Sequence, residues 1–261
     1  MFAGKRYVVT GAASGIGHAT VSKLLAVGAD VYSLDRNEPT AAVTGHIAVD
    51  LADPRSIDSA LEQLQGEFDG LMNVAGIPGT APSAQVLAVN CLAVRHLTEA
   101  FFGLLRPGGT VTIVSSTAGV GWPQRLAAIR DLLSTDTFDD GAAWFEAHPQ
   151  CGNAYNFSKE VSTTYVLSMG LALAQMGFRI NAVAPGPVET PILADFENSM
   201  GKEVLDGVKG LLGRHATPDE IADVVVFLAS DAARWINGQV INVDGGITGA
   251  VLSGVVPAPE I

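Results

Sequence analysis

The chain is poor in basic residues. It contains 15 lysines and arginines against 27 aspartates and glutamates, a formal net charge of −12 at pH 7. Nucleic-acid phosphates require a basic surface, so this balance argues against a nucleic-acid partner. It says little about small ligands, because a small molecule responds to the local charges of its site and not to the sum over the chain.

Cysteines and long apolar runs are also scarce. The two cysteines, Cys91 and Cys151, are too few for a disulfide framework or a zinc site, and no metal is predicted. Both are expected to be small buried or half-buried apolar residues in a reducing cytoplasm. The opening residues lack a signal-peptide layout, and no apolar run approaches the ~18–20 residues that span a bilayer. A cytoplasmic protein without a membrane partner is therefore expected.

What the chain has is ample apolar sequence for one core. Hydrophobic residues make up 48% of its 261 residues, and no repeat or linker divides it, so residues 1–261 are predicted to form a single domain. Short apolar strands alternate with helical patterns, which predicts an α/β fold: one Rossmann-type, doubly wound parallel sheet with helices on both faces. The crossover between Asp35 and His46 is too short for a full helix. Strands are expected at 5–11, 29–35, 46–50, 68–76, 108–116, 178–186 and 238–246, and helices at 15–28, 54–67, 84–105, 155–176 and 218–229.

A glycine-rich loop, "TGAASGIG", joins the first strand to the first helix. Gly11 permits a tight turn, Gly15 the close approach of a pyrophosphate, and Gly17 the packing of helix on strand. Ser14 and Ile16 complete the loop. The helix N-terminus then offers free N–H groups to phosphates, so the loop predicts a dinucleotide site.

Asp35, at the end of the second strand, indicates which dinucleotide is bound. A carboxylate there accepts hydrogen bonds from both adenosine ribose hydroxyls and repels a 2′-phosphate, which favours NAD over NADP. Against this, the adjacent Arg36 could turn towards a phosphate, and an Asp at a strand end is often only a cap. Asp50, followed by Leu51, is placed to meet the adenine amino group; capping of the next helix is an equal alternative.

The stretch "NAYNFSKE" places Tyr155 and Lys159 four residues apart at the start of a predicted helix. Positions i and i+4 share a helix face, so both side chains can enter one cleft. A nearby ammonium favours the phenolate, which would lower the phenol pKa from ~10 and suit it to proton transfer. The plain alternative is an ordinary surface face of a helix.

Six motifs in a fixed order resemble the short-chain dehydrogenase/reductase family over nearly the whole chain. They are the glycine loop, "NVAG" at 73–76, "VNC" with Asn90, "VSS" ending at Ser116, "YNFSK" at 155–159 and "PGPVETP" at 185–191. Each motif alone is weak, but six in order are specific.

The resemblance implies a catalytic set of four residues. Tyr155 would be the general acid/base, Lys159 would lower its pKa and bind the nicotinamide ribose, Ser116 would hold the substrate oxygen, and Asn90 would anchor a water of the proton relay. Ser115 competes with Ser116, and the strand alternation and the family pattern favour the second serine. The implied activity is NAD(H)-dependent interconversion of a secondary alcohol and a ketone.

The resemblance also extends the expected cofactor site beyond the glycine loop. In the family the loop after the sixth strand contacts the nicotinamide, where Val188 and Thr190 match positions that bond the carboxamide and a nearby phosphate. Further residues expected to bind cofactor are Asn73, Ala75, Gly76, Tyr155, Lys159, Pro185 and Gly186.

The chain departs from the family pattern between Ser116 and Tyr155, which lie 39 positions apart where about a dozen is usual. Residues 122–152 are read as a helical insertion before the catalytic helix. The hypothesis is a flap that lines the substrate pocket, with Trp122, and reshapes a subunit interface. This layout resembles the bacterial 3α-hydroxysteroid dehydrogenase/carbonyl reductase group, which suggests an apolar cyclic or aromatic, steroid-like substrate.

Two later segments complete the expectations. Residues 192–212 read as a substrate lid carrying Phe196 and Met200, which follow the expected substrate contact Pro187. The apolar tail, 246–261, is expected to pack on a neighbouring subunit or over the cleft, and family members suggest a homodimer or homotetramer. A non-catalytic dinucleotide sensor with the same fold is the alternative. All four catalytic positions are filled, which argues against it.

Overall fold

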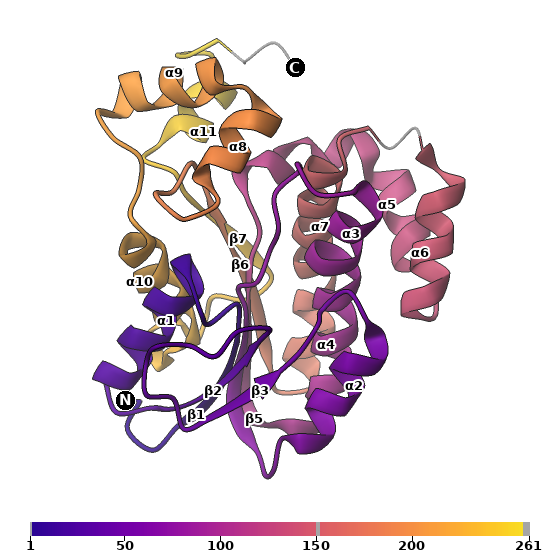
Figure 1. Cartoon of the computed structure of the whole chain (residues 1–261), viewed down its shortest axis with the longest axis vertical. Helices are drawn as coiled ribbons and strands as arrows, with labels where there is room; N and C mark the ends of the chain where they lie inside the picture. Colours follow the sequence, from indigo (N-terminus) through magenta and orange to yellow (C-terminus); the bar gives the residue numbers. More distant parts are fainter. Residues whose placement is uncertain (1, 150–151, 258–261) are drawn as a thin grey trace.

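A computed structural model of the chain describes residues 2–149 and 152–257 and contains one seven-stranded sheet. The strand order is β3-β2-β1-β4-β5-β6-β7, and every neighbouring pair is parallel. This confirms the predicted doubly wound sheet (Figure 1). The strands are β1 (Arg6–Thr10), β2 (Asp30–Asp35), β3 (Gly45–Ala48), β4 (Phe68–Asn73), β5 (Leu105–Val114), β6 (Arg179–Pro185) and β7 (Gln239–Val243).

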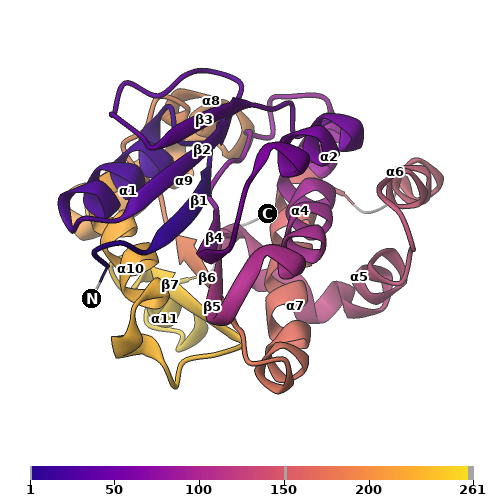
Figure 2. The same ribbon diagram turned by 90° about the horizontal axis from the view of Figure 1, so that it is seen from below.

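Helices cover both faces of this sheet. Figure 2 shows α1 and α10 on one side and α2, α4 and α7 on the other. The segments α8 and α9 lie above the carboxyl ends of the strands, at the top of Figure 1. The helices are α1 (Gly15–Ala26), α2 (Pro54–Gln63), α3 (Ser83–Leu87), α4 (Ala93–Phe101), α5 (Leu126–Leu133), α6 (Phe138–Ala147), α7 (Ala154–Gln175), α8 (Leu193–Met200), α9 (Lys202–Leu212), α10 (Pro218–Ala229) and α11 (Ile247–Leu252).

Two apolar cores lie on the two faces of the sheet. One joins strand residues such as Leu71 and Ile113 to Leu97 of α4 and Val161 of α7. The other packs α1 and α10 against the opposite faces of the same strands. Strands that are covered on both faces read as nearly continuous apolar runs, which is why the sequence predicts them well.

The sequence predicts the connection between β2 and β3 correctly but not the one between β4 and β5. Residues 36–44, between β2 and β3, contain no helix, as the short crossover predicts. The single helix expected at 84–105 is instead divided into α3, a π-helical turn at Ala88–Leu92, α4 and a 3-10 turn at Phe102–Leu104. The π turn carries Asn90. Such turns interrupt the i→i−4 hydrogen bonding of a helix, and apolar periodicity does not reveal them.

The predicted insertion is helical. A 3-10 segment, η3 (Thr117–Arg125), leads into α5 and α6, which lie outside α7 and α4 in Figure 2. Arg95 of α4, only 6% exposed, donates to the Leu132 and Thr137 carbonyls and to the Thr135 hydroxyl. The buried guanidinium thus fixes the turn between α5 and α6 to the main body.

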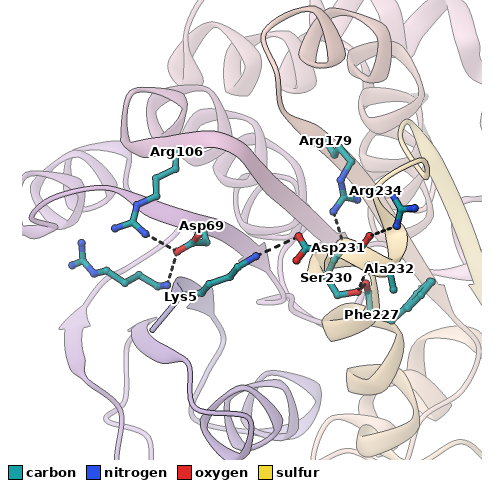
Figure 3. A network of polar contacts seen from close by, with 10 residues as sticks. Lys5, Asp69, Arg106, Arg179, Phe227, Ser230, Asp231, Ala232 and Arg234 are labelled. Carbon is teal, nitrogen blue, oxygen red and sulfur yellow. Dashed lines mark hydrogen bonds and ion pairs between the residues drawn. The ribbon is translucent and has the colours of Figure 1, made fainter. Parts of the chain in front are cut away.

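Charged side chains link the strands at their amino ends (Figure 3). The Asp69 carboxylate at the start of β4 accepts from the Arg6 backbone N–H at 2.8 Å and from Arg106 of β5 at 3.3 Å. Lys5 pairs with Asp231 at 3.4 Å, and Arg179 of β6 donates to the Ser230 carbonyl. These contacts hold the starts of the central strands together, at the edge that carries none of the six motifs.

Within the described residues, one helical stretch, Ser83–Leu104, is long and apolar enough to cross a bilayer by length and composition alone, and 67% of its most apolar window is buried inside the fold. It is the central helix of the α4–α7 layer, and core helices of this kind meet the same criterion.

Gly17 gives a stability prediction for the fold. A Cβ on this residue would overlap the Gly11 carbonyl, which belongs to rigid backbone, so Gly17→Ala should lower the free energy of unfolding by about 1–3 kcal/mol. The control is Gly207→Ala on α9, where a Cβ meets nothing within 4 Å and a helix-interior alanine should add about 0.5–1 kcal/mol. Urea unfolding curves measure both variants. Equal midpoints for Gly17→Ala and the wild type would contradict the packing role.

Candidate active site

A cavity of about 190 Å³ opens at the carboxyl edge of the sheet, between the glycine loop, the starts of η3 and α7, and the lid helices. Among the described residues that line it, Lys159 is the sole charged side chain. It collects fourteen of the residues predicted from the sequence, namely Ser14, Gly15, Ile16, Gly17, Gly76, Ser116, Tyr155, Lys159, Pro185, Gly186, Pro187, Val188, Thr190 and Phe196.

Tyr155 is the second residue of α7, and its position is set by the helix cap. The Asn153 side chain accepts from the backbone N–H groups of Tyr155 at 2.9 Å and Asn156 at 3.2 Å. Asn is a preferred N-cap residue because its side chain replaces missing helical partners. The phenol ring is 7% exposed and packs edge-on against Phe196 of α8, with 5.0 Å between ring centroids. Helix α8, part of the segment expected to form a lid, therefore packs directly on Tyr155.

Lys159 lies one turn further along α7 and is 5% exposed. Its ammonium donates to the Val114 carbonyl at the end of β5 at 3.0 Å and lies 5.7 Å from the centroid of the Tyr155 ring. Burial lowers the pKa of Lys159 to about 8, with a smaller opposing effect from Cys91. Cys91 is itself fully buried, as expected, and Cys151 lies outside the described residues.

The pKa of Tyr155 moves in the opposite direction from the sequence expectation. Burial raises the pKa of the phenol to about 12, and a hydrogen bond with the Ser116 side chain offsets only part of this rise. The physical reason is that α7, η3 and the lid remove the ring from water, which disfavours the charged phenolate. Proximity to Lys159 on one helix face does not by itself reverse this desolvation.

The two adjacent serines have different surroundings. Ser116 hydrogen-bonds Tyr155, and its hydroxyl also accepts from the Ala118 backbone N–H at 3.2 Å, which caps η3. Ser115 is 3% exposed, and its hydroxyl donates to the Lys159 carbonyl at 3.0 Å. Both residues line the cavity, but Ser116 is the one bonded to the phenol, in agreement with the preference for the second serine.

Asn90 lies behind the cavity wall in the π turn. Its side-chain amide pairs with the Ile77 backbone in both directions, at 2.8 Å and 2.9 Å, and this fixes the loop after β4. The Asn90 carbonyl accepts from the Ser162 hydroxyl of α7 at 3.0 Å. A Cβ at Gly76 would lie 3.4 Å from the Asn90 amide oxygen and 3.6 Å from the Lys159 ammonium. Asn90 thus lies close to the lysine without lining the cavity.

The glycine loop has the geometry of a phosphate cradle. Gly11 has φ of +70°, and a Cβ there would lie 2.8 Å from Ala75 Cα, so the loop and the "NVAG" segment approach backbone to backbone. The Thr10 hydroxyl accepts from the Val74 and Ala75 N–H groups, both at 3.0 Å. Ser14 precedes α1 without capping it, which leaves the first-turn N–H groups directed at the cavity.

Asp35 lies outside the cavity at the carboxyl end of β2, next to the loop. Its carboxylate accepts from the Ala13 N–H at 3.0 Å and from the Asn37 N–H at 2.9 Å. Asp50 is exposed after β3, and the residue that caps α2 is Asp53, through the Arg55 N–H. The capping alternative for Asp50 therefore does not hold for α2.

The remaining predicted cofactor residues lie around the cavity and not on its wall. Arg36 is exposed, while Leu51 packs against the core. Asn73 is 3% exposed and donates to the Thr98 hydroxyl at 2.9 Å, so its side chain links β4 to α4. Ala75 meets the cavity region through its backbone contact with Gly11.

Only some of the residues predicted to contact the substrate line the cavity. Pro187 and Phe196 line the cavity, whereas Trp122 packs against the α4–α7 core, and the Met200 side chain is outside the described part of the structure. The described part of 122–152 contributes no lining residue, because α5 and α6 pack outward on α7 and α3. Apolar spacing alone does not tell a core face from a pocket wall. Lining residues absent from the prediction are Val74, Ile77, Val114, Ser115, Thr117, Pro191, Ile192, Leu193 and Leu205.

Comparison with known families gives two matches along the chain. The family described as short chain dehydrogenase matches residues 5–127, and the family described as Enoyl-(Acyl carrier protein) reductase matches residues 145–248. The stretch left between them, 128–144, covers most of α5, the turn after it and most of α6. The unmatched stretch therefore lies inside the predicted insertion at 122–152.

Individual relatives cover almost the whole chain. A coniferyl-alcohol dehydrogenase from a Pseudomonas species is 40% identical and covers 93% of this chain and 96% of its own. The 3-alpha-hydroxysteroid dehydrogenase/carbonyl reductase of Comamonas testosteroni is 32% identical, covering 92% and 95%. A crystal structure of a 3-alpha-hydroxysteroid dehydrogenase from a Pseudomonas species, complexed with NADH, superposes with a TM-score of 0.81 at 30% identity, covering 97% of this chain and 100% of the other.

These matches favour an enzyme and give no support to the non-catalytic sensor. The chain belongs to the short-chain dehydrogenase/reductase family and is an oxidoreductase that acts on alcohol or ketone groups.

Proposed function

We propose that the protein is an NAD(H)-dependent dehydrogenase of apolar cyclic or aromatic alcohols. The observation that carries the proposal is the composition of the cavity. It brings Tyr155, Lys159 and Ser116 together with the glycine loop and the loop after β6, so a bound nicotinamide and a substrate hydroxyl would share one small space.

The residues present fit an NAD molecule. Ser14, Gly15, Ile16 and Gly17 of the glycine loop line the cavity, and a Cβ at Gly15 would lie 3.3 Å from Thr190 in the loop after β6, so only a glycine leaves this approach open. Asp35 is held beside the loop by the Ala13 N–H, where its charge opposes a 2′-phosphate. A solved relative binds NADH, which supports the same choice here. When bound, the nicotinamide supplies the hydride chemistry.

The protein's own contribution is the movement of a proton at the Tyr155 hydroxyl. The phenol donates this proton to a carbonyl oxygen during reduction and accepts it from a carbinol during oxidation. Ser116, hydrogen-bonded to the phenol, would hold the same substrate oxygen. Lys159 supplies a buried positive charge near the ring and would bind the nicotinamide ribose. Asn90 orders the loop in front of the lysine through Ile77.

The walls around the phenol support an apolar substrate. Beyond the catalytic residues, the lid side of the cavity is formed by apolar side chains, including Ile77, Ile192, Leu193, Phe196 and Leu205. The 40% identical relative is named for coniferyl alcohol, a flat aromatic with a primary allylic hydroxyl. We therefore extend the proposal from secondary alcohols to arylalkyl alcohols and place single-ring substrates before steroids, since the cavity is about 190 Å³ with the lid in place.

We also propose a cytoplasmic homodimer or homotetramer. Leu171 on α7 is 75% exposed, Leu252 on α11 is 71% exposed, and Val255 in the tail is 78% exposed. Exposed apolar side chains of this size favour burial against a second subunit. Lid and tail, 192–212 and 246–261, keep their proposed roles in covering the substrate and meeting a neighbour.

The deciding experiment is a substrate panel followed by the absorbance of reduced nicotinamide. Arylalkyl alcohols, hydroxysteroids and small hydroxy acids are each tested with NAD and NADP. Turnover of an arylalkyl alcohol with NAD is the expected result, and Tyr155→Phe should lower it by about 10²–10⁴-fold while leaving NAD binding intact. Wild-type activity in Tyr155→Phe, or turnover of hydroxy acids alone, would overturn the proposal.

The buried phenol predicts opposite pH dependence in the two directions. Oxidation requires phenolate, so kcat/KM for the alcohol should rise about tenfold for each pH unit up to the Lys159 pKa of about 8, and less steeply above it, where the ammonium that favours phenolate is lost. Reduction requires the protonated phenol and should not gain from alkali over the same range. Initial rates in both directions across neutral and alkaline pH provide the measurement. A flat profile for oxidation would show that Tyr155 is not the group that takes the proton.

The cofactor assignment predicts a change in selectivity for Asp35→Ser. Loss of hydrogen bonds to a charged acceptor should lower kcat/KM for NAD by about tenfold to a hundredfold, and removal of the carboxylate should raise the value for NADP. Glu62→Ser on α2 is the control, an exposed carboxylate that is not among the predicted cofactor residues. The NAD-to-NADP ratio should be nearly unchanged there. If Asp35→Ser lowers kcat/KM equally for NAD and NADP, the carboxylate serves only to hold the glycine loop and does not select the cofactor.

A further inference from the structure

The segment that follows Ser116 lies against the backbone of the catalytic helix. A Cβ at Gly119 would lie 2.7 Å from the Lys159 carbonyl, and one at Gly121 would lie 2.6 Å from the Glu160 carboxylate. Gly119 is therefore required by the close approach of two backbones, whereas a side chain at Gly121 would displace the Glu160 carboxylate. The 3-10 segment η3 thus crosses α7 at the turn that holds Lys159, and it ends at Arg125.

Arg125 and Glu160 form a two-pronged ion pair at this crossing. Arg125 Nη2 donates to Glu160 Oε1 at 2.8 Å, and Arg125 Nε lies 2.6 Å from Glu160 Oε2. The Glu160 side chain is 3% exposed and that of Arg125 is 29% exposed. Burial raises the pKa of Glu160, and Arg125 opposes this rise. The carboxylate therefore depends on the guanidinium for its charge.

The Arg125 guanidinium also packs against an aromatic ring of α7. Arg125 Cζ lies 5.4 Å from the centroid of the Phe157 ring, which is fully buried in α7. Phe157 in turn stacks with Trp144 and Phe145 of α6, at centroid distances of 6.0 Å and 6.3 Å. A planar guanidinium fits both a carboxylate edge and an aromatic face, which a lysine does not. Arg125 is thus one of the points at which the insertion and α7 meet, together with the stacked rings of α6.

We infer that the Arg125–Glu160 pair is a positioning device that holds Ser116 against Tyr155 and Lys159. Glu160 directly follows the catalytic lysine, and Arg125 ends the segment that begins directly after the catalytic serine. One hydrogen bond and a second close ion-pair contact join the two side chains at two points, so the pair restrains how η3 lies on α7. Ser115, bonded to the Lys159 carbonyl at 3.0 Å, restrains the other end of the same segment.

A purely stabilising role makes a different prediction from a positioning role. Replacing both members of a buried ion pair by apolar residues of similar size is often neutral for stability, whereas removing one member leaves an uncompensated charge. The double variant Arg125→Met/Glu160→Met therefore separates the two roles. A pair that only stabilises would be replaced without loss, while a pair that positions would leave a folded protein with poor catalysis.

The test uses the full-length protein and a substrate that the wild type turns over, so its kinetic arm rests on the proposed function. The double variant is expected to keep its Tm close to the wild-type value and to bind NAD normally. Its kcat should fall by about 10–100-fold, because small displacements of reacting groups are costly, while KM changes little. Arg130→Met, on the exposed face of α5, is the matched control and should keep wild-type kcat.

Two further variants sharpen the kinetic test. Arg125→Lys keeps the positive charge but loses the two-pronged geometry, so it should recover only part of the lost kcat. Arg125→Met alone should lower both Tm and kcat, since the buried Glu160 is left unpaired. Wild-type kcat in the folded double variant would overturn the inference, whatever the single variants do.

A readout without substrate keeps the inference separate from the proposed function. Tyrosine labelled with ¹³C at the ring is titrated by NMR in the wild type and in the double variant. The Ser116 hydrogen bond lowers the Tyr155 pKa, so displacement of Ser116 in the double variant should move the Tyr155 titration to higher pH than in the wild type. An unchanged titration in the folded double variant would contradict positioning. Absence of alcohol turnover in the wild type would count against the proposed function alone.

Discussion

A buried ammonium group constrains this site more than any other feature. Lys159 is 5% exposed, in a cavity where the described lining residues offer no carboxylate, and its Nζ bonds the Val114 carbonyl at the end of β5. Burying a charge without an ion pair is costly, and the lowered pKa expresses that cost. Several contacts from neighbouring segments therefore fix the turn of α7 that carries the lysine. The Ser115 hydroxyl on its carbonyl, the glycine contact of η3 and the Asn90 loop all meet at this one turn of α7.

The parts of this arrangement that depend on backbone shape could be predicted from the sequence. Continuous apolar strands are typical of a parallel sheet covered on both faces, and all seven strands were expected. The glycine loop was predictable for the same reason, since Gly11 and Gly17 stand where any Cβ would collide. Fourteen of the predicted site residues meet in one cavity because parallel strands place their carboxyl ends at one edge.

The parts that depend on packing could not be predicted. Periodicity assigns Trp122 to an apolar face without saying whether that face meets a pocket or a core, and the structure places it on the core. The π turn at Asn90 leaves no mark in apolar spacing. The direction of the Tyr155 pKa was missed because one neighbouring charge can be read from a helix face, whereas desolvation sums over α7, η3 and α8.

The insertion bears on the site through α7 instead of through the cavity wall. Residues 128–144 stand outside the matched family segments, and α5 and α6 give the cavity no described lining residue. They do stack Trp144 and Phe145 on Phe157, two residues after Tyr155. The stacking on Phe157 restrains the first turns of α7. Tyr155 and Lys159 are both buried in these turns, so a change in this packing would change the access of water to their side chains.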